Sequence, residues 1–252
     1  MDLIVVLLAS LGAGLVDAIV GGGGLILVPA LFATYPGAAP ATLLGTNKCA
    51  SVWGTAVAAV QFSRRVRLDH AVVLPAAVLA LLGALLGAWT VTRVHADFLR
   101  LLLPFLLLGV LLYTLARKDL GGVHAPRHGR RAATAVAGAI GALVGFYVGF
   151  FGPGTGSFFI FALVRFLGYD FLNASATAKL LNVATNLAAL ALLGWQGHVW
   201  WALGLAMAVA NVAGSLLGSR LALRHGAGFV RTVFIAVVGA LILKTGCDAF
   251  LR

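Results

Sequence analysis

The sequence of 252 residues contains no glutamate, and aspartate supplies all seven of its acidic residues. Charged residues make up only 10% of the chain, whereas a typical soluble domain has roughly 25%. A membrane pathway for cations is expected to contain several buried carboxylates, so the scarcity of acids disfavours a cation transporter. So few charges also leave no stretch of sequence suited to a soluble domain.

Cysteines and catalytic motifs are scarce as well. Cys49 and Cys247 lie in different halves of the chain, in no spacing typical of a metal or redox site. We interpret both as small buried hydrophobic residues. Ser157 and His198 superficially suggest a nucleophile and a base, but they lie on different segments, and no GxSxG or HExxH motif is present. We therefore expect no enzyme, no cofactor and no metal site.

Long hydrophobic runs fill most of the sequence. Hydrophobic residues make up 62% of the chain, and the mean hydropathy is +1.05. Most runs are close to the ~20 residues with which a helix crosses a bilayer. No basic segment or convincing cleavage site accompanies the first run, so we expect it to be retained rather than removed as a signal peptide. These features predict an all-α integral membrane protein.

Basic residues outnumber acidic ones and give the chain a formal net charge of +11. They lie in short loops between hydrophobic runs, as is usual for the cytoplasmic loops of membrane proteins. The only extended polar segment, residues 117–131, is strongly basic. We predict that this segment is a cytoplasmic linker and that the protein does not bind nucleic acid.

An internal repeat divides the chain into two halves. Sliding the sequence by 131 residues without a gap pairs Thr46 with Thr177 and Lys48 with Lys179. The same offset pairs GALLGA at residues 83–88 with GSLLGS at residues 214–219. A constant offset that aligns charged residues as well as small ones is hard to explain by composition alone.

The charges of two equivalent loops indicate how the halves are oriented. Residues 63–67 (SRRVR) contain three arginines, whereas residues 194–198 (GWQGH) contain none. Equivalent loops of a parallel repeat lie on one side of the membrane, but those of an inverted repeat lie on opposite sides, where the positive-inside rule predicts this loss. We therefore predict two inverted structural repeats. Inversion requires an odd number of crossings per half, which follows if each first segment enters and leaves the membrane on the same side.

Each repeat is then predicted to contain a re-entrant helical hairpin and three transmembrane helices. The first repeat, residues 1–116, has a hairpin at 3–33 and helices at about 41–62, 70–92 and 98–116. The second repeat, residues 132–252, has a hairpin at 132–167 and helices at about 172–195, 198–219 and 229–247. A plain arrangement of eight spans without re-entrant hairpins distributes the basic residues more evenly and ranks second.

Two glycine-rich segments would form the tips of these hairpins near the middle of the membrane. They are the four glycines at residues 21–24 and GPGTG at residues 152–156. Irregular backbone at this depth is tolerated only inside protein or beside a watery cavity. A new half-helix begins near Gly24 and near Gly156, and its free N–H groups and positive dipole end attract anions. Tight turns for close helix packing are the alternative interpretation.

Lysines and neutral polar residues follow each tip. An intramembrane lysine is energetically expensive and is therefore a functional candidate, although each could instead extend its ammonium to the membrane surface. A positively charged, glycine-lined site favours an anionic substrate. The predicted substrate-binding residues are Gly22, Gly23, Gly24, Thr46, Asn47, Lys48, Gly154, Thr155, Gly156, Thr177, Lys179, Asn182 and Asn186.

Asp17 is the one acidic residue clearly inside a hydrophobic segment, and its repeat equivalent is Val148. Three roles fit the sequence: an ion pair with Lys48 or Lys179, transfer of a coupling proton, or a cap or hydrogen bond near the first tip. One acid against two lysines leaves the site positively charged in each case.

The glycine and lysine segments closely resemble the TauE/SafE-type sulfite exporter family of anion permeases. The resemblance covers nearly the whole chain, through GLVDAIVGGGGLILVPAL and GTNKCASVWGTAVAA in the first half and GFFGPGTGSFF and NASATAKLLNVATN in the second. The family's motifs fall on residues 21–24, Pro29, residues 45–48, residues 152–156 and Lys179. Pro153 and Thr155 stand where the first tip has Gly22 and Gly24, so the two tips need not bind substrate alike.

The resemblance implies a secondary transporter, an exporter of small sulfur-containing anions such as sulfite, sulfoacetate or other organosulfonates, in a bacterial inner membrane. It would work by alternating access around a midplane site between the two hairpin tips. No nucleotide-binding loop is present in the sequence, which agrees with a secondary mechanism. The alternatives are an anion channel and a structural or assembly protein of the membrane. The expected partners are the anion and the lipid bilayer, and a homodimer is left open.

Overall fold

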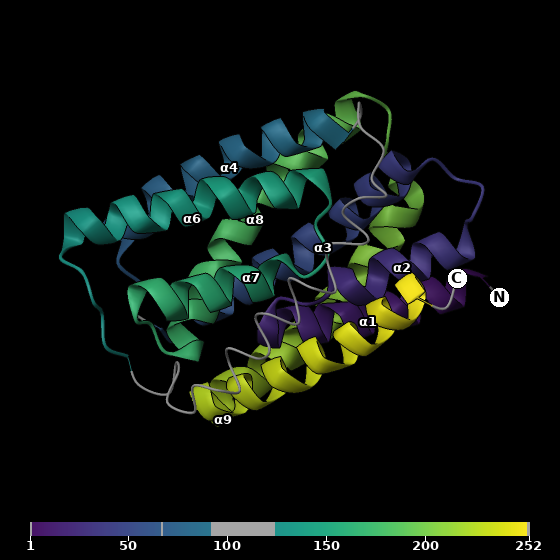
Figure 1. The fold of residues 1–252 in the computed structure, drawn as a ribbon. Coiled ribbons are helices and arrows are strands. Elements are labelled where there is room, and N and C mark those ends of the chain that lie inside the picture. Colours follow the sequence, from purple (N-terminus) through teal and green to yellow (C-terminus); the bar gives the residue numbers. More distant parts are fainter. Residues whose placement is uncertain (1, 67, 92–123, 251–252) are drawn as a thin grey trace.

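The computed structural model describes residues 2–66, 68–91 and 124–250, with side chains up to residue 236. All regular structure in these ranges is helical (Figure 1). The helix predicted at 98–116, part of the predicted linker and the side chain of Cys247 lie outside this description. Within it, the predicted all-α class is confirmed.

Four helices form the described part of the first half: α1 (Asp2–Val20), α2 (Gly24–Thr34), α3 (Pro40–Ser63) and α4 (His70–Val91). The break between α1 and α2 lies within the four glycines, where Gly21 has a φ of +73° that other residues rarely adopt. Pro40 begins α3, where its missing N–H and fixed φ are tolerated. α4 begins after Asp69, whose Oδ1 accepts a hydrogen bond from the Ala71 N–H at 3.1 Å.

The second half contains α6 (Arg130–Phe150), α7 (Thr155–Ala162), the π-helical turn η1 (Leu163–Leu167), α8 (Phe171–Trp195) and α9 (Trp201–Phe250). The break between α6 and α7 contains Gly152 and Gly154, with φ of +91° and +78°. The Asp170 carboxylate caps α8 by accepting a hydrogen bond from the Asn173 N–H at 2.7 Å. Gly226, at φ +75° and ψ −164°, is not helical and divides α9 into two helices.

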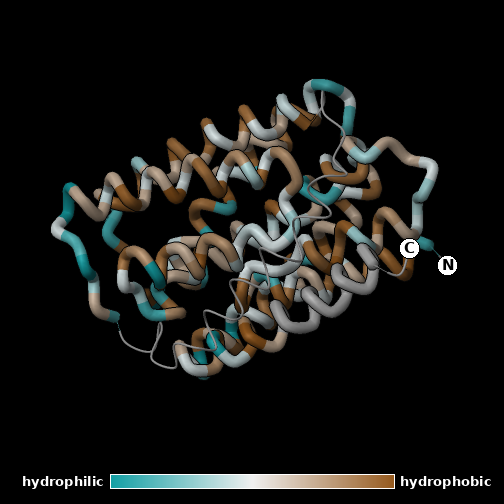
Figure 2. The backbone as a smooth tube through the Cα atoms, in the orientation of Figure 1, coloured by the Kyte–Doolittle hydropathy of each residue, from teal (hydrophilic) through white to brown (hydrophobic). Residues whose placement is uncertain are grey.

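Five of the described helices are long and apolar enough to cross a membrane, namely α1, α4, α6, α8 and α9 up to Ala236. Large hydrophobic side chains cover their outer surfaces, and Leu143 and Val209 are 75% and 74% exposed. Hydrophilic residues gather in connecting segments such as residues 124–129 (Figure 2). A surface of this kind suits lipid rather than water. The chain is therefore a multi-pass membrane protein.

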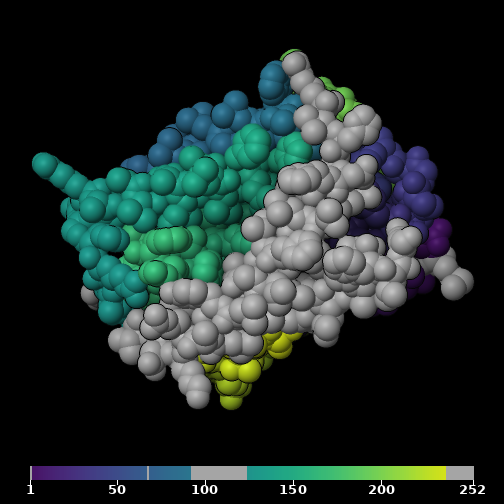
Figure 3. Space-filling model, viewed as in Figure 1, coloured from purple at the N-terminus to yellow at the C-terminus, as the bar shows by residue number. Residues whose placement is uncertain are grey.

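Glycines allow α4 to pack against α6 backbone to backbone. The two helices lie side by side (Figures 1 and 3). A Cβ atom at Gly83 would overlap the Ala142 carbonyl, and one at Gly87 would overlap the Phe146 carbonyl. One of the two GALLGA-type motifs therefore lies at an interface where glycine lets the backbones touch.

The same contacts recur between α1 and the first part of α9. A Cβ atom at Gly214 would overlap the Leu11 carbonyl, and one at Gly218 would overlap the Leu15 carbonyl. Each of these four residues lies 131 positions from its counterpart in the α4–α6 interface. In both interfaces, the contact that lies four residues later in one helix also lies four residues later in the other. α4 therefore runs parallel to α6, and α1 runs parallel to the first part of α9.

Candidate functional site

The two glycine breaks meet inside the molecule. A Cβ atom at Gly21 would overlap the backbone of Gly156, and one at Gly156 would overlap the backbone of Gly21. Gly24 lies beside Pro153, whose Cα would stand 3.5 Å from a Cβ atom at Gly24. Gly21 and Gly156 are both buried. This close approach accounts for glycine at these two positions.

The backbone at both breaks has hydrogen-bond donors without partners among the described residues. In the described part of the chain, no hydrogen bond engages the N–H groups of Gly22, Gly23, Gly154 and Gly156. Unpaired N–H groups at the start of a helix commonly bind anions. The two sets of donors lie close together because Gly21 touches Gly156.

Serine hydroxyls from the second half hold the first break in place. Ser157 Oγ donates to the Val20 carbonyl at 3.1 Å, and Ser175 Oγ donates to the Ile19 carbonyl at 3.1 Å. These bonds satisfy carbonyl groups that the end of α1 leaves without helical partners. The sequence does not predict this role, although a serine directly after GPGTG is a signal for it.

Ser157 and His198 take part in separate contacts. His198 lies in the connection between α8 and α9, where its Nδ1 is 3.4 Å from the Thr42 hydroxyl, whereas the Ser157 hydroxyl is bonded at the first break. No hydrogen bond joins the two side chains, so they do not form a nucleophile–base pair in this structure. Cys49 is buried, as predicted.

Lys179 is buried in α8, and its ammonium has no hydrogen-bond partner among the described residues. The residue is only 2% exposed, so its ammonium does not extend to the molecular surface. Its Nζ lies 4.4 Å from the centre of the Phe62 ring on α3, which is a cation–π contact. A buried ammonium is costly unless a partner supplies acceptor oxygens.

Lys48 is buried in α3 and reaches the glycine break of the other half. A Cβ atom at Gly152 would stand 2.7 Å from the Lys48 Nζ. Lys179 of the second half meets Phe62 of the first half. The equivalent pair, exchanged between the halves, is Lys48 and Leu193, so Lys48 has no aromatic ring at this position. The two lysines therefore have different surroundings.

Asp17 is half-buried near the first break. Its Oδ2 accepts a hydrogen bond from the Thr55 hydroxyl at 2.9 Å, and its Cβ would stand 2.7 Å from a Cβ atom at Gly23. The carboxylate acts electrostatically on both lysines. The ion pairs within 4.0 Å in the described part of the chain, His124 with Asp170 and Arg130 with Asp69, include neither Asp17 nor a lysine. Of the three predicted roles, the structure contains the hydrogen bond near the first tip.

Asparagines add neutral polar groups near the lysines. Asn182 and Asn186 follow Lys179 by three and seven residues, which places all three on one face of α8. Asn47 precedes Lys48, and its Oδ1 is buried without a hydrogen-bond partner in the described residues. The Thr155 hydroxyl donates to the Gly152 carbonyl within the second break.

Thr46 and Thr177 lie away from this arrangement. The Thr46 hydroxyl donates to the Thr42 carbonyl at 2.7 Å and accepts from the Trp200 N–H at 3.0 Å. Thr177 lines a cavity of about 200 Å³ beside residues 124–130, which neither lysine lines. The described contacts thus join the two glycine breaks to each other and to Lys48, whereas the two equivalent threonines contact other residues.

Known proteins resemble the chain over nearly its whole length. The family model described as "Sulfite exporter TauE/SafE" matches residues 6–245. The chain is 36% identical over 240 residues to "Probable membrane transporter protein ORF9" of Sinorhizobium sp, covering 95% of this chain and 90% of the relative. It is 37% identical over 237 residues to "Probable membrane transporter protein YfcA" of Escherichia coli strain K12, covering 94% and 87%.

A relative from Haemophilus influenzae, named "Probable membrane transporter protein", is 34% identical over 236 residues, covering 94% of this chain and 91% of the relative. No solved structure matches the chain. The relatives that resemble this multi-pass membrane protein are thus named as probable membrane transporters. The chain belongs to the TauE/SafE sulfite exporter family.

Proposed function

We propose that this protein is a secondary transporter that exports small sulfur-containing anions, such as sulfite, sulfoacetate or other organosulfonates. The observation that carries the proposal is the buried Lys179 ammonium, which lacks an acceptor among the described residues. A sulfite or sulfonate group presents several oxygens that an ammonium and backbone N–H groups can bind together. The family description names sulfite.

The proposed binding site lies between the two glycine breaks. The N–H groups of Gly22, Gly23, Gly154 and Gly156, which make no hydrogen bond to a described residue, supply donors from both halves. The ammonium groups of Lys48 and Lys179 supply charge, and Asn47, Asn182 and Asn186 supply neutral polar groups. Asp17 offsets part of this positive charge when no anion is bound.

An inverted arrangement of the two halves is supported by the directions of the helices. Hydrogen bonds join Thr46 to Trp200 and Gly54 to Ser215, so α3 runs parallel to the first part of α9, as α1 does. α4 begins after residues 64–69, at the end where α3 stops, and runs through the molecule in the opposite direction (Figure 1). α4 and its parallel neighbour α6 thus run opposite to α1. Equivalent helices α1 and α6 pointing in opposite directions are what inverted repeats require.

This arrangement supports transport by alternating access. Because Gly21 touches Gly156, an anion can lie between the breaks only when the two backbones separate. Movement of one repeat against the other would open the site to each side in turn. By the positive-inside rule, residues 63–67 and the basic linker lie in the cytoplasm, and the membrane is the bacterial inner membrane.

The test is a screen of the detergent-purified protein against sulfite, sulfoacetate, taurine, sulfate, acetate and chloride. A transported anion should raise thermal stability, since a ligand at 100 times its Kd adds about 2.7 kcal/mol to the free energy of unfolding. A protein carrying both Lys48→Met and Lys179→Met is the control and should lose the shift. If none of these anions stabilises the wild-type protein, the proposed function is wrong. Unsaturable, channel-like conductance in liposomes would favour the anion channel instead.

A further inference from the structure

The cavity beside residues 124–130 has a polar wall outside the proposed site. It is lined by Asp69, His124, His128, Arg130, Tyr169, Asn173 and Thr177, together with apolar residues. Its volume of about 200 Å³ compares with roughly 30 Å³ for one water in the liquid. The cavity therefore has room for a small oxyanion and several waters.

Thr177 is the most deeply buried polar residue of this wall. It is only 2% exposed but lines the cavity. Its hydroxyl makes no hydrogen bond to any described residue, although the equivalent Thr46 makes two. Thr177 precedes Lys179 by two residues in α8, so the cavity reaches the helix that carries this lysine.

The equivalent position in the first half is closed. Trp200 donates its N–H to the Thr46 hydroxyl at 3.0 Å, and its ring packs edge-on against Tyr35 with centroids 5.3 Å apart. The His198 carbonyl also presses against Gly45, where a Cβ atom would overlap it. The residue 131 positions before Trp200 is Asp69, whose smaller side chain lines the cavity instead.

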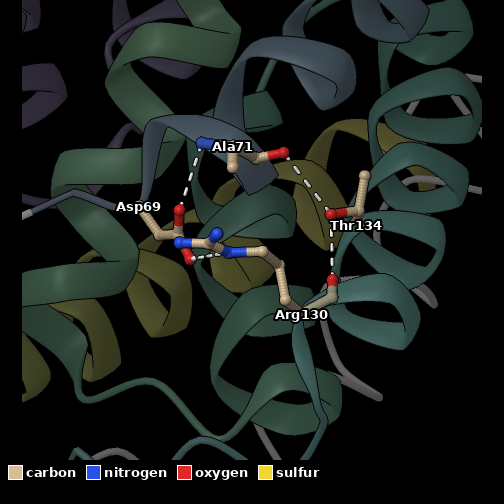
Figure 4. A network of polar contacts seen from close by, with 4 residues as sticks. All are labelled: Asp69, Ala71, Arg130 and Thr134. Carbon is tan, nitrogen blue, oxygen red and sulfur yellow. Dashed lines mark hydrogen bonds and ion pairs between the residues drawn. The ribbon is translucent and has the colours of Figure 1, made fainter.

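The rim of the cavity carries an arginine that is only loosely paired. Arg130 Nε lies 3.6 Å from Asp69 Oδ2, and the arginine side chain is 73% exposed. Asp69 also accepts from the Ala71 N–H, and Thr134 donates to the Ala71 and Arg130 carbonyls (Figure 4). These contacts tie the start of α4 to the start of α6. A single exposed ion pair is weak, so the guanidinium can bind another anion.

Thr177 borders an open cavity, whereas the equivalent Thr46 is closed off by Trp200. From this difference we infer that the cavity is an anion vestibule. It admits small oxyanions from the side of residues 124–130 as far as Thr177, and Arg130 at its rim attracts them. In the same state Trp200 closes the position of Thr46. The inference rests on the proposed function, since it gives the transported anion a place to enter the protein on this side.

The test uses cysteine modification in oriented membrane vesicles, after replacement of Cys49 and Cys247. Thr177→Cys should react with a small anionic methanethiosulfonate applied from the side of residues 124–130. Sulfite binding is measured in parallel on the unmodified protein. Thr46→Cys is the matched control in the first half and should stay unreactive to the reagent applied from the side of residues 124–130. Asn173→Cys, one turn before Thr177, provides a second reporter if Thr177→Cys folds poorly.

The charge of the rim is tested with the same reporter. The anionic reagent should modify Thr177→Cys faster than a cationic reagent of similar size, and Arg130→Gln should reduce this preference about fivefold at low salt. Asp69→Asn should increase the preference. Arg131→Gln removes a neighbouring charge that does not line the cavity, so it should change the preference for the anionic reagent little.

Two outcomes overturn the inference. Equal reaction with the anionic and cationic reagents would show that the cavity does not select anions. Lack of reaction at both Thr177→Cys and Asn173→Cys would show that it does not open to this side. If sulfite and the other anions bind while the cysteines fail, the vestibule is wrong and the proposed transport stands. If the cysteines react with the expected preference but no anion binds, the proposed transport is wrong.

Discussion

At the scale of single residues, the two lysines should contribute differently to anion binding. Lys→Met keeps much of the apolar stem and removes the ammonium. We expect Lys179→Met to weaken anion binding by about 2–4 kcal/mol, because its ammonium is buried and has no acceptor among the described residues. Lys48→Met should also weaken binding, by an amount that depends on how far Asp17 already balances its charge. Calorimetry on both single variants and the double variant measures these losses.

Folding must be separated from binding in these variants. Each should insert into the membrane and elute as a monodisperse protein, since methionine keeps the apolar stem and removes a charge whose burial is costly. Unchanged anion affinity in both single variants and the double variant would mean that the site lies elsewhere.

The ring of Phe62 should be energetically coupled to Lys179. Their cation–π contact at 4.4 Å is buried, and such contacts are worth roughly 2 kcal/mol when desolvated. Phe62→Leu creates the residue that the repeat has at Leu193, so leucine fits an equivalent position. We expect Phe62→Leu to cost more stability in the wild-type background than in Lys179→Met, by about the cation–π energy. Chemical unfolding in detergent measures both.

The matched control for this cycle is Lys48→Met, because Lys48 has no ring at the equivalent position. The effects of Phe62→Leu and Lys48→Met on the free energy of unfolding should simply add. Equal coupling to both lysines would contradict a specific contact between Phe62 and Lys179.

At the scale of helices, the start of α2 offers a clean test of backbone donors. Gly24 is the first residue of α2, and a Cβ atom there meets no atom closer than 3.5 Å. Gly24→Pro removes one N–H at the first helical position, where proline is common, but proline also disfavours the αR conformation of the preceding Gly23, so folding of this variant is checked first; Gly24→Ala keeps the N–H. We expect Gly24→Pro alone to weaken anion binding, by about 1.5–3 kcal/mol if that N–H binds the anion. Similar affinity in the two variants would argue against a backbone donor at this residue.

The helix interfaces should tolerate almost no added volume. A Cβ atom at Gly87 would overlap the Phe146 carbonyl, and one at Gly218 would overlap the Leu15 carbonyl. Gly87→Ala and Gly218→Ala should each destabilise the protein by about 1–3 kcal/mol. Gly12→Ala is the control, because nothing lies within 4 Å of its Cβ position. A thermal shift as large for Gly12→Ala as for the other two would contradict this packing role.

At the scale of the whole molecule, inverted repeats place equivalent loops on opposite sides of the membrane. Ser63 and Gln196 are both exposed at the ends of α3 and α8. In a protein without Cys49 and Cys247, Ser63→Cys should react with an impermeant thiol reagent only from the cytoplasm, and Gln196→Cys only from the opposite side. Labelling of both from one side would exclude the inverted topology. Substituting uncharged residues leaves the loop arginines in place as the topological signal.

The sequence by itself determined the membrane class, the helical architecture and the breaks at the two glycine segments. A hydrophobic run of bilayer length predicts a membrane helix, and a cluster of glycines predicts a break in one. Both predictions depend on neighbouring residues in the sequence and do not require knowledge of which helices pack together. The 131-residue offset also identified the two small-residue motifs that the structure places at helix interfaces. The sequence also singled out the two lysines but left open whether they extend to the membrane surface, and the structure buries both.

Only the tertiary structure decided which side chains meet across helices. Helical periodicity tells which residues share one face, but the partner of that face depends on how several helices pack together. Thus the Phe62 ring on Lys179, the bond from Thr55 to Asp17 and the serines that bind the end of α1 had no sequence signal strong enough to predict them. The same reason separates Thr46 and Thr177 from the lysines: equal positions in two repeats face different neighbours, a tryptophan in one half and an open cavity in the other.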